Sequence, residues 1–137
     1  MQQTSASSAP VWLSGGCHCG RVRFRVRKRS STALECNCSV CRKKGLLHLI
    51  VHPSDFELSQ GAEALTVYTF NSMKARHTFC RVCGVQAFYT PRSHPDHVDV
   101  NVRCLDGDAA ASFGVEAFDG RNWERNVGAL HERVGTP

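Results

Sequence analysis

Seven of the eight cysteines fall into three short clusters, and these thiols are the side chains best suited to chemistry. The clusters are Cys17-His18-Cys19, Cys36-Asn37-Cys38-Ser39-Val40-Cys41 and Cys80-Arg81-Val82-Cys83. Thiols two or three residues apart lie too close to join distant loops, whereas several can reach one metal ion from a single turn. Because Zn²⁺ takes about four sulfur or nitrogen ligands, seven thiolates are too many for one closed site and one too few for two.

Two of the clusters supply two thiols each and end in a glycine. Cys80-x-x-Cys83-Gly84 is typical of half a zinc knuckle, in which the glycine takes the positive φ of the tight turn. Cys17-x-Cys19-Gly20 is a second half. Together the two halves can complete a closed four-thiolate site, which would act as a structural staple.

The middle cluster offers three thiols, Cys36, Cys38 and Cys41, from one six-residue loop. Three protein ligands leave the fourth position of a zinc ion free, and an open position separates a catalytic zinc from a structural one. A thiol that binds there loses its proton at neutral pH, because the metal stabilises the thiolate. This cluster is therefore the candidate catalytic site.

Spacing alone does not settle which clusters share a metal. The first cluster can instead combine with Cys36 and Cys38, and Cys104 or His77 can supply a missing ligand, which would make both sites structural.

The remaining candidates are expected to have ordinary roles. His48 and His52 are four residues apart in a strand pattern and share a face, which favours packing. His18 is expected to be solvated beside the metal ligands, and Cys104 to be a small buried thiol. No residue stands out as a general base.

The length and composition favour reduced thiols. A chain of 137 residues predicts one domain, and no apolar run approaches the roughly 18 residues of a membrane helix. The first ten residues carry neither a basic region nor an apolar stretch, so no secretory signal is expected. We therefore expect a cytoplasmic protein without membrane contact, in which the cysteines bind metal rather than form disulfides.

Basic residues concentrate in two stretches, 21–29 and 42–44, and the formal net charge is +5. In the first stretch they alternate with Val22, Phe24 and Val26, which predicts a strand with one buried face and one charged face. The charged face indicates either an ordinary solvated surface or an attraction for an anionic ligand or nucleic acid.

The elements that must position these clusters are short strands rich in β-branched and aromatic residues, separated by Gly, Pro, Asn or Ser. A helical turn is expected after Asp106 and another near Asn122. We predict a mainly β domain at 11–127, with loose ends at 1–10 and 128–137. The predicted strands are Val22–Arg27, Ala33–Glu35, Leu46–Val51, Leu65–Phe70, His77–Phe79, Val85–Tyr89 and Val98–Val102.

In this order and with their flanks, the three clusters strongly resemble the glutathione-dependent formaldehyde-activating enzyme family, whose vertebrate branch includes centromere protein V. The flanks that carry the resemblance are Gly15-Gly16 before the first cluster and His77-Thr78-Phe79 before the last. Further matching segments are Tyr68–Asn71, Phe88–Arg92 and Asn101–Leu105.

The resemblance implies a small Mss4-like zinc-bound β-sheet domain with two Zn²⁺ per chain. It implies that Cys17, Cys19, Cys80 and Cys83 hold the structural zinc, and that Cys36, Cys38 and Cys41 hold the catalytic zinc. The implied activity is that of a carbon–sulfur lyase, namely the reversible condensation of glutathione with formaldehyde, or a similar small aldehyde, to S-(hydroxymethyl)glutathione.

Partners and substrate contacts are less defined by the sequence. Cations near the middle cluster or late in the chain are expected to pair with the glutathione carboxylates, the candidates being Arg42, Lys43, Lys44 and Arg103. The centromere branch suggests an alternative, a zinc-stapled module that binds nucleic acid or protein, with a nuclear location in a eukaryotic member. Exposed strand edges make a homodimer plausible.

Overall fold

The structure is a computed structural model that describes residues 11–133. The expected loose end 1–10 and the last four residues of the expected loose end 128–137 lie outside the described residues. The strands are β1 (Val11–Gly16), β2 (Arg23–Lys28), β3 (Thr32–Cys36), β4 (His48–Val51), β5 (Phe56–Gln60), β6 (Leu65–Tyr68), β7 (His77–Cys80), β8 (Phe88–Tyr89), β9 (Val98–Asn101) and β10 (Gly114–Phe118). The α-helices are α2 (Ser39–Lys44) and α3 (Trp123–Arg133). The 3-10 turns are η1 (Pro53–Asp55), η2 (Ala62–Ala64), η3 (Val102–Cys104), η4 (Ala109–Ser112) and η5 (Gly120–Asn122).

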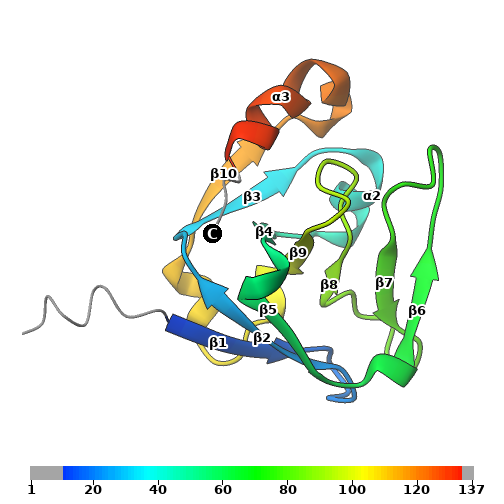
Figure 1. Ribbon diagram of the computed structural model, residues 1–137, viewed down its shortest axis with the longest axis vertical. Helices are drawn as coiled ribbons and strands as arrows, with labels where there is room; N and C mark the ends of the chain where they lie inside the picture. Colours follow the sequence, from blue (N-terminus) through cyan, green and yellow to red (C-terminus); the bar gives the residue numbers. More distant parts are fainter. Residues whose placement is uncertain (1–10, 134–137) are drawn as a thin grey trace, which may run out of the picture.

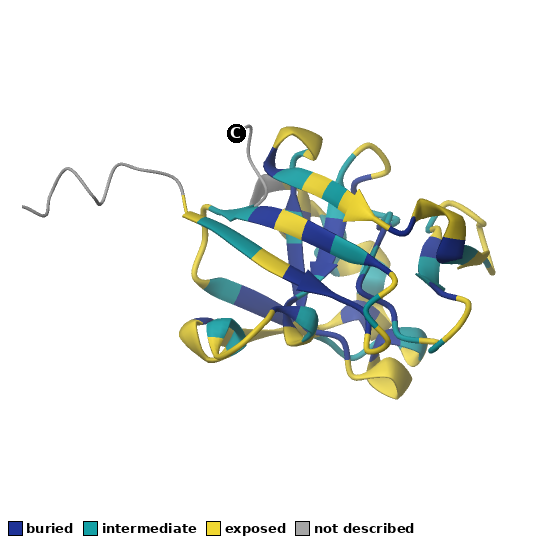
Figure 2. Cartoon of the chain, turned by 90° about the horizontal axis from the view of Figure 1, so that it is seen from below, coloured by how far each residue is buried: buried dark blue, intermediate teal, exposed yellow. Residues whose placement is uncertain are grey.

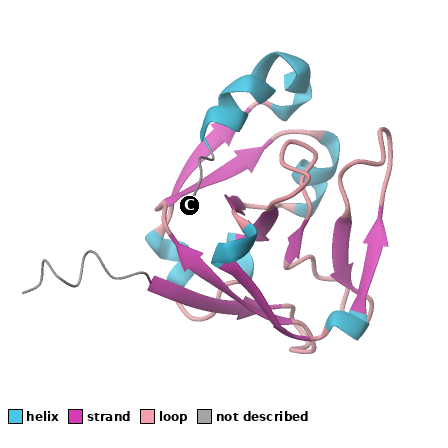
Figure 3. Cartoon of the chain, viewed as in Figure 1, coloured by secondary structure: helices cyan, strands magenta, loops and turns pink. Residues whose placement is uncertain are grey.

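The strands form three sheets, with the orders β1-β2-β5, β10-β3-β4-β9-β8 and β6-β7 (Figure 1). The pairings are antiparallel except for β10, which runs parallel to β3 and places Phe118 opposite Cys36. Strands clearly outnumber helices (Figure 3), so the predicted mainly β class is confirmed. No helix among the described residues is long and apolar enough to span a membrane.

The core lies between the three-stranded and five-stranded sheets. Phe24 and Val26 of β2 are buried, and they pack with Leu49 and Val100 of the larger sheet. Because side chains alternate along a strand, the arginines between them face outward. Figure 2 shows the resulting bands of buried and exposed residues along the strands. The strand predicted from the period-two pattern of the first basic stretch is therefore confirmed as β2.

Carboxylates already neutralise much of the charged face of β2. Arg25 forms an ion pair with Glu57 of β5 at 2.6 Å, and Arg23 pairs with Asp106. Just beyond these residues, Arg29 lies 2.8 Å from the buried carboxylate of Asp55. These contacts favour the solvated-surface interpretation over a phosphate-binding face.

Three strands escaped sequence prediction, namely β1, β5 and β10. In β10 most residues are exposed, so the alternation of apolar and polar residues that marks a half-buried strand is missing. Among the predicted strands, β6 ends at Tyr68 rather than Phe70, and β8 begins only at Phe88. The turn expected after Asp106 is η4, whose N-cap residue is Asp108.

The C-terminal segment is more ordered than expected. The helix predicted near Asn122 is α3, and the boundary expected at residue 127 falls inside it. The physical reason is burial on one side of this helix, where Leu130 is only 7% exposed. Figure 1 shows α3 following β10 at one end of the molecule.

Replacing Phe24 should weaken the core strongly. Its ring stacks on Phe56 with centroids 5.7 Å apart and meets Phe88 edge-on at 6.1 Å. We expect Phe24→Ala to lower the free energy of unfolding by about 3–5 kcal/mol, because it leaves a cavity. Urea denaturation of the metal-loaded protein measures this. Val11→Ala, at a residue 52% exposed, is the control; a loss below about 1 kcal/mol for Phe24→Ala would contradict the assignment of the core.

Candidate functional site

Four cysteines from the two halves of the chain meet at one point. The ligand atoms of Cys17, Cys19, Cys80 and Cys83 all lie within 4.8 Å of one another. The Sγ atoms of Cys17 and Cys19 are 3.6 Å apart, and those of Cys19 and Cys80 are 3.7 Å apart. Sulfurs at about 2.3 Å from a tetrahedral zinc would be about 3.8 Å apart, whereas a disulfide needs about 2.05 Å. The geometry fits a metal site and excludes disulfides.

Local backbone geometry holds this group in place. The amide of Val22 lies 3.4 Å from the Cys17 sulfur and donates a hydrogen bond to it. Gly84 has a φ of 80° and donates its N–H to the Cys80 carbonyl at 2.7 Å, as the knuckle turn requires. Cys80 is fully buried. The group thus links the start of the first sheet to the end of β7.

The other three clustered cysteines form a second group around the start of α2. Cys36 ends β3, Cys38 is the N-cap residue of α2, and Cys41 is buried in its first turns. Their Sγ atoms lie within 4.8 Å of one another. Among the described residues, no His, Cys, Asp or Glu joins them as a fourth member of such a group. The arrangement can hold a metal ion through three thiolates.

The two alternative ligands considered from the sequence belong to neither group. Cys104 is half-buried, and the Asn101 side chain donates a hydrogen bond to its sulfur over 3.5 Å. The Nδ1 atom of His77 lies 3.3 Å from the Gln86 amide nitrogen.

Negative charge collects on the three-cysteine group. Hydrogen bonds from the thiols of Cys36 and Cys41 lower the pKa of Cys38 to about 2. The same interaction with Cys38 raises the pKa of Cys36 to about 11, and the hydrogen bonds with Cys36 and Cys38 raise the pKa of Cys41 as well. Cys38 is thus the thiolate of the group, and it accepts hydrogen bonds from the thiols of its two neighbours. A bound metal cation would replace the protons of those thiols.

Gly120 of η5 packs directly on this group. A Cβ atom built at residue 120 would lie 2.3 Å from the Cys36 sulfur and 3.1 Å from the Cys38 Cβ. Only glycine therefore allows the chain after β10 to pass here without displacing Cys36.

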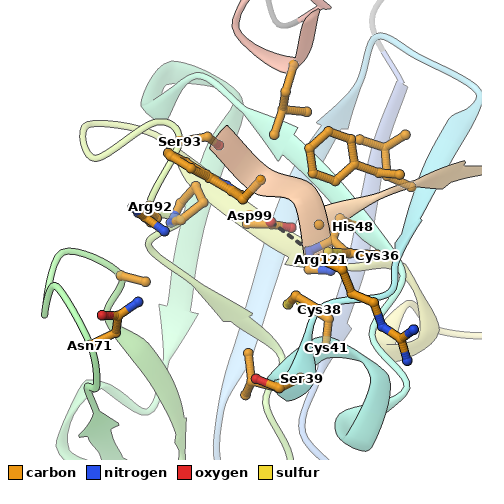
Figure 4. A pocket seen from close by; sticks show the side chains of 18 of the residues that line it. Cys36, Cys38, Ser39, Cys41, His48, Asn71, Arg92, Ser93, Asp99 and Arg121 are labelled. Carbon is orange, nitrogen blue, oxygen red and sulfur yellow. Dashed lines mark hydrogen bonds and ion pairs between the residues drawn. The ribbon is translucent and has the colours of Figure 1, made fainter. Parts of the chain in front are cut away.

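A cavity of about 840 Å³ opens beside the three cysteines (Figure 4). Its floor is the face of the five-stranded sheet that points away from the core. The residues of this floor are Leu34 of β3, His48 and Ile50 of β4, Tyr89 of β8 and Asp99 of β9. One side comes from the segment after β6, with Phe70 and Asn71, and the opposite side comes from η5 and α3. The volume suits a ligand far larger than a metal ion alone.

A buried polar cluster lies in the floor of the cavity. His48 Nδ1 is 2.8 Å from Asp99 Oδ2, and the Tyr89 hydroxyl is 3.3 Å from the same ring nitrogen. Burial opposes the charged form of His48, but the Asp99 carboxylate outweighs it and raises the pKa of His48. Burial and the same carboxylate raise the pKa of Tyr89 well above its usual range.

The two histidines that the sequence placed on one face have different environments. His48 lies in the cavity floor, whereas His52 lies beyond the end of β4, where its Nδ1 is 3.0 Å from the Ser54 hydroxyl. The four-residue spacing predicted one shared face because it assumed a continuous strand. The strand β4 ends at Val51, and His52 is already the N-cap residue of η1.

Arg92, Arg121 and Arg125 are the arginines that line the cavity. Arg92 lies in the loop after β8, and the other two lie in η5 and α3. None of them is among the substrate-binding cations expected from the sequence. The Arg92 guanidinium stacks 3.7 Å above the Trp123 ring and pairs with Glu124 at 3.2 Å. Among the described residues, no carboxylate lies within ion-pair distance of Arg121 or Arg125.

The expected cations lie elsewhere. Lys44 Nζ reaches the Gln86 amide oxygen at 2.5 Å, and Arg103 Nε donates to the Gly45 carbonyl at 2.9 Å. Arg42 borders a separate, smaller depression, and Lys43 is exposed. None of these four cations lines the cavity, although all but Arg103 follow the three cysteines closely in sequence.

Comparisons with known proteins identify the family of the chain. The family model described as glutathione-dependent formaldehyde-activating enzyme matches residues 12–120. A Halomonas elongata protein, provisionally named a glutathione-dependent formaldehyde-activating enzyme, is 31% identical over 106 residues, which cover 70% of this chain and 67% of that protein. A crystal structure of a Rhodobacter sphaeroides protein has a TM-score of 0.64 at 39% identity, covering 69% of this chain and 89% of that chain.

The fold and the cysteine groups thus define a small, mainly β protein with two thiol groups that could each hold a metal ion. The chain belongs to the glutathione-dependent formaldehyde-activating enzyme family, which confirms the resemblance inferred from its motifs.

Gly120→Ala should disturb the three-cysteine group selectively. The added Cβ would displace Cys36, so we expect metal per chain to fall from about two ions to about one, with the other site intact. Inductively coupled plasma mass spectrometry of dialysed protein measures this. Gly128→Ala is the matched control, because its Cβ would meet nothing within 4 Å; equal metal content in both variants would refute the crowding argument.

Proposed function

We propose that this protein is a zinc-dependent enzyme that adds the thiol of glutathione to formaldehyde, or to a similar small aldehyde, giving S-(hydroxymethyl)glutathione. The observation that carries the proposal is the three-cysteine group at the edge of a large cavity, without a fourth protein ligand among the described residues. Family membership supports the same chemistry.

The two cysteine groups suit two different zinc ions. Cys17, Cys19, Cys80 and Cys83 would hold a structural ion, since four thiolates close its coordination. Cys36, Cys38 and Cys41 would hold the catalytic ion, and such an ion, when bound, stabilises a substrate thiolate at neutral pH. The eight free cysteines suit a reducing compartment such as the cytoplasm.

The protein's own residues would bind and orient the peptide. Glutathione carries two carboxylates, and the guanidinium groups of Arg121 and Arg125, which form no ion pair among the described residues, match them in charge. Phe70, Tyr89 and Trp123 supply apolar walls that would exclude water around the reacting sulfur. The substrate would therefore lie between the sheet floor and α3, with its thiol towards the three cysteines.

Removing one thiol of the three should abolish catalysis while preserving the fold. We expect Cys38→Ser to lower the rate of glutathione-dependent formaldehyde consumption by at least about 100-fold, because the metal that activates the thiol is lost. The assay follows formaldehyde loss above the spontaneous rate. Cys104→Ser, outside both groups, is the control. Wild-type turnover that persists in Cys38→Ser would defeat the proposal.

Arg121→Ala should weaken the binding of glutathione in particular. Loss of one charged hydrogen bond corresponds to roughly a tenfold rise in KM for glutathione, whereas KM for 2-mercaptoethanol, which has no carboxylate, should not change. Steady-state kinetics with both thiols measures the contrast. Arg42→Ala, which lies outside the cavity, is the matched control. Equal effects of Arg121→Ala on both thiols would argue against carboxylate recognition.

A further inference from the structure

The cavity floor contains a charged pair that the proposed metal chemistry does not use. Asp99 is 2% exposed and His48 is 6% exposed, although both carry polar groups that normally seek water. The sheet register brings them together, since β4 and β9 pair with His48 opposite Asn101 and Ile50 opposite Asp99. Diagonal neighbours on one face of a sheet are within side-chain reach. Figure 4 shows the contact beside Cys36.

Only half of the pair's hydrogen-bonding capacity is used. Asp99 Oδ2 accepts from His48 Nδ1 at 2.8 Å. The other two polar atoms of the pair, His48 Nε2 and Asp99 Oδ1, are buried and have no hydrogen-bond partner among the described residues. A buried polar atom left without a hydrogen bond destabilises the folded protein. In residues that line a cavity, such atoms indicate where a ligand group or a bound water belongs.

The proposed reaction needs a group of this kind. As the sulfur–carbon bond forms, the π bond of the aldehyde opens, and the proton that leaves sulfur must reach oxygen. RSH and CH₂O then give RSCH₂OH, with no other reactant. A neutral imidazole whose Nδ1–H is held by a carboxylate presents its Nε2 lone pair as a base, and the resulting imidazolium is stabilised by that carboxylate.

His77, the other histidine of the cavity, is poorly suited to the task. Its ring is stacked between Phe70 and Tyr89, with centroids 5.6 and 4.7 Å away. Burial and the charge of nearby Lys44 lower its pKa, and its Nδ1 lies against the Gln86 amide rather than a carboxylate. The other carboxylate of the cavity, Glu124, is exposed and pairs with Arg92. Of the two histidines that line the cavity among the described residues, only His48 combines a carboxylate partner with a buried nitrogen that has no hydrogen-bond partner.

We propose that His48, oriented by Asp99, is the proton shuttle of this site: Nε2 takes the proton of the substrate thiol and returns it, directly or through one bound water, to the oxygen of the adduct. This inference rests on the proposed function. Tyr89 closes the cluster on the β8 side and keeps the pair apart from bulk water.

Replacement of either partner tests the shuttle by kinetics. We expect His48→Gln to lower kcat for the glutathione–formaldehyde condensation by roughly 100-fold with little change in KM, and Asp99→Asn to lower kcat in the same direction. Metal content and circular dichroism show whether each variant is folded and loaded. His52→Gln, at the other histidine of this segment and outside the cavity, is the matched control. A folded, metal-loaded His48→Gln with wild-type kcat overturns the inference.

Nitrogen NMR of the wild-type protein tests the inference without an activity assay and without variants whose folding must be checked. In ¹⁵N-histidine-labelled, metal-loaded protein, saturation with glutathione and formaldehyde should shift the Nε2 resonance of His48 and leave that of His52 in place. An unmoved His48 resonance overturns the inference. If the wild type does not accelerate the condensation, the proposed function is wrong, and the same NMR result then decides whether His48 contacts a ligand.

Discussion

The distance between sulfur atoms is the constraint on which the rest of this structure depends. Thiolates held within 4.8 Å of one another repel, unless a cation or shared protons lie between them. The four-cysteine group links the three-stranded sheet to β7. The three-cysteine group holds the start of α2 against the end of β3. With a metal ion bound in each group, such links would stabilise a small domain with a limited core, and the three-cysteine link would also form the proposed reactive site.

The five-stranded sheet contributes to both the core and the cavity, because its two faces carry different side chains. One face carries Ala33, Leu49 and Val100 into the core, and the other presents His48 and Asp99 to the cavity. The alternation of a strand makes this separation automatic, since neighbouring residues point to opposite sides. The apolar face of the sheet thus packs on the core, and its polar face forms the floor of the candidate substrate site. The segment η5 and α3, with Arg121 and Arg125, forms one side of that site.

Sequence reasoning reached the cysteine groups and most strands, because ligand spacing and period-two alternation are local signals. It did not reach the cavity. His48 and Asp99 are 51 residues apart and meet only through the register of β4 and β9. Phe118 lies opposite Cys36, and Gly120 packs on it, because β10 pairs in parallel with β3. This pairing is non-local, and the exposed residues of β10 do not encode it in a readable pattern. Residue types can be read from the sequence, but the register between strands that are far apart in the chain cannot.

The central claim is that the three-cysteine group binds zinc through protein sulfur alone and leaves its fourth position for a substrate thiol. Anomalous diffraction at the zinc edge from crystals grown with and without glutathione tests it directly. The account predicts two ions per chain, with the glutathione sulfur as fourth ligand of the ion at Cys36, Cys38 and Cys41. A fourth protein side chain on that ion in both crystals, or no ion there at full zinc loading, would contradict it.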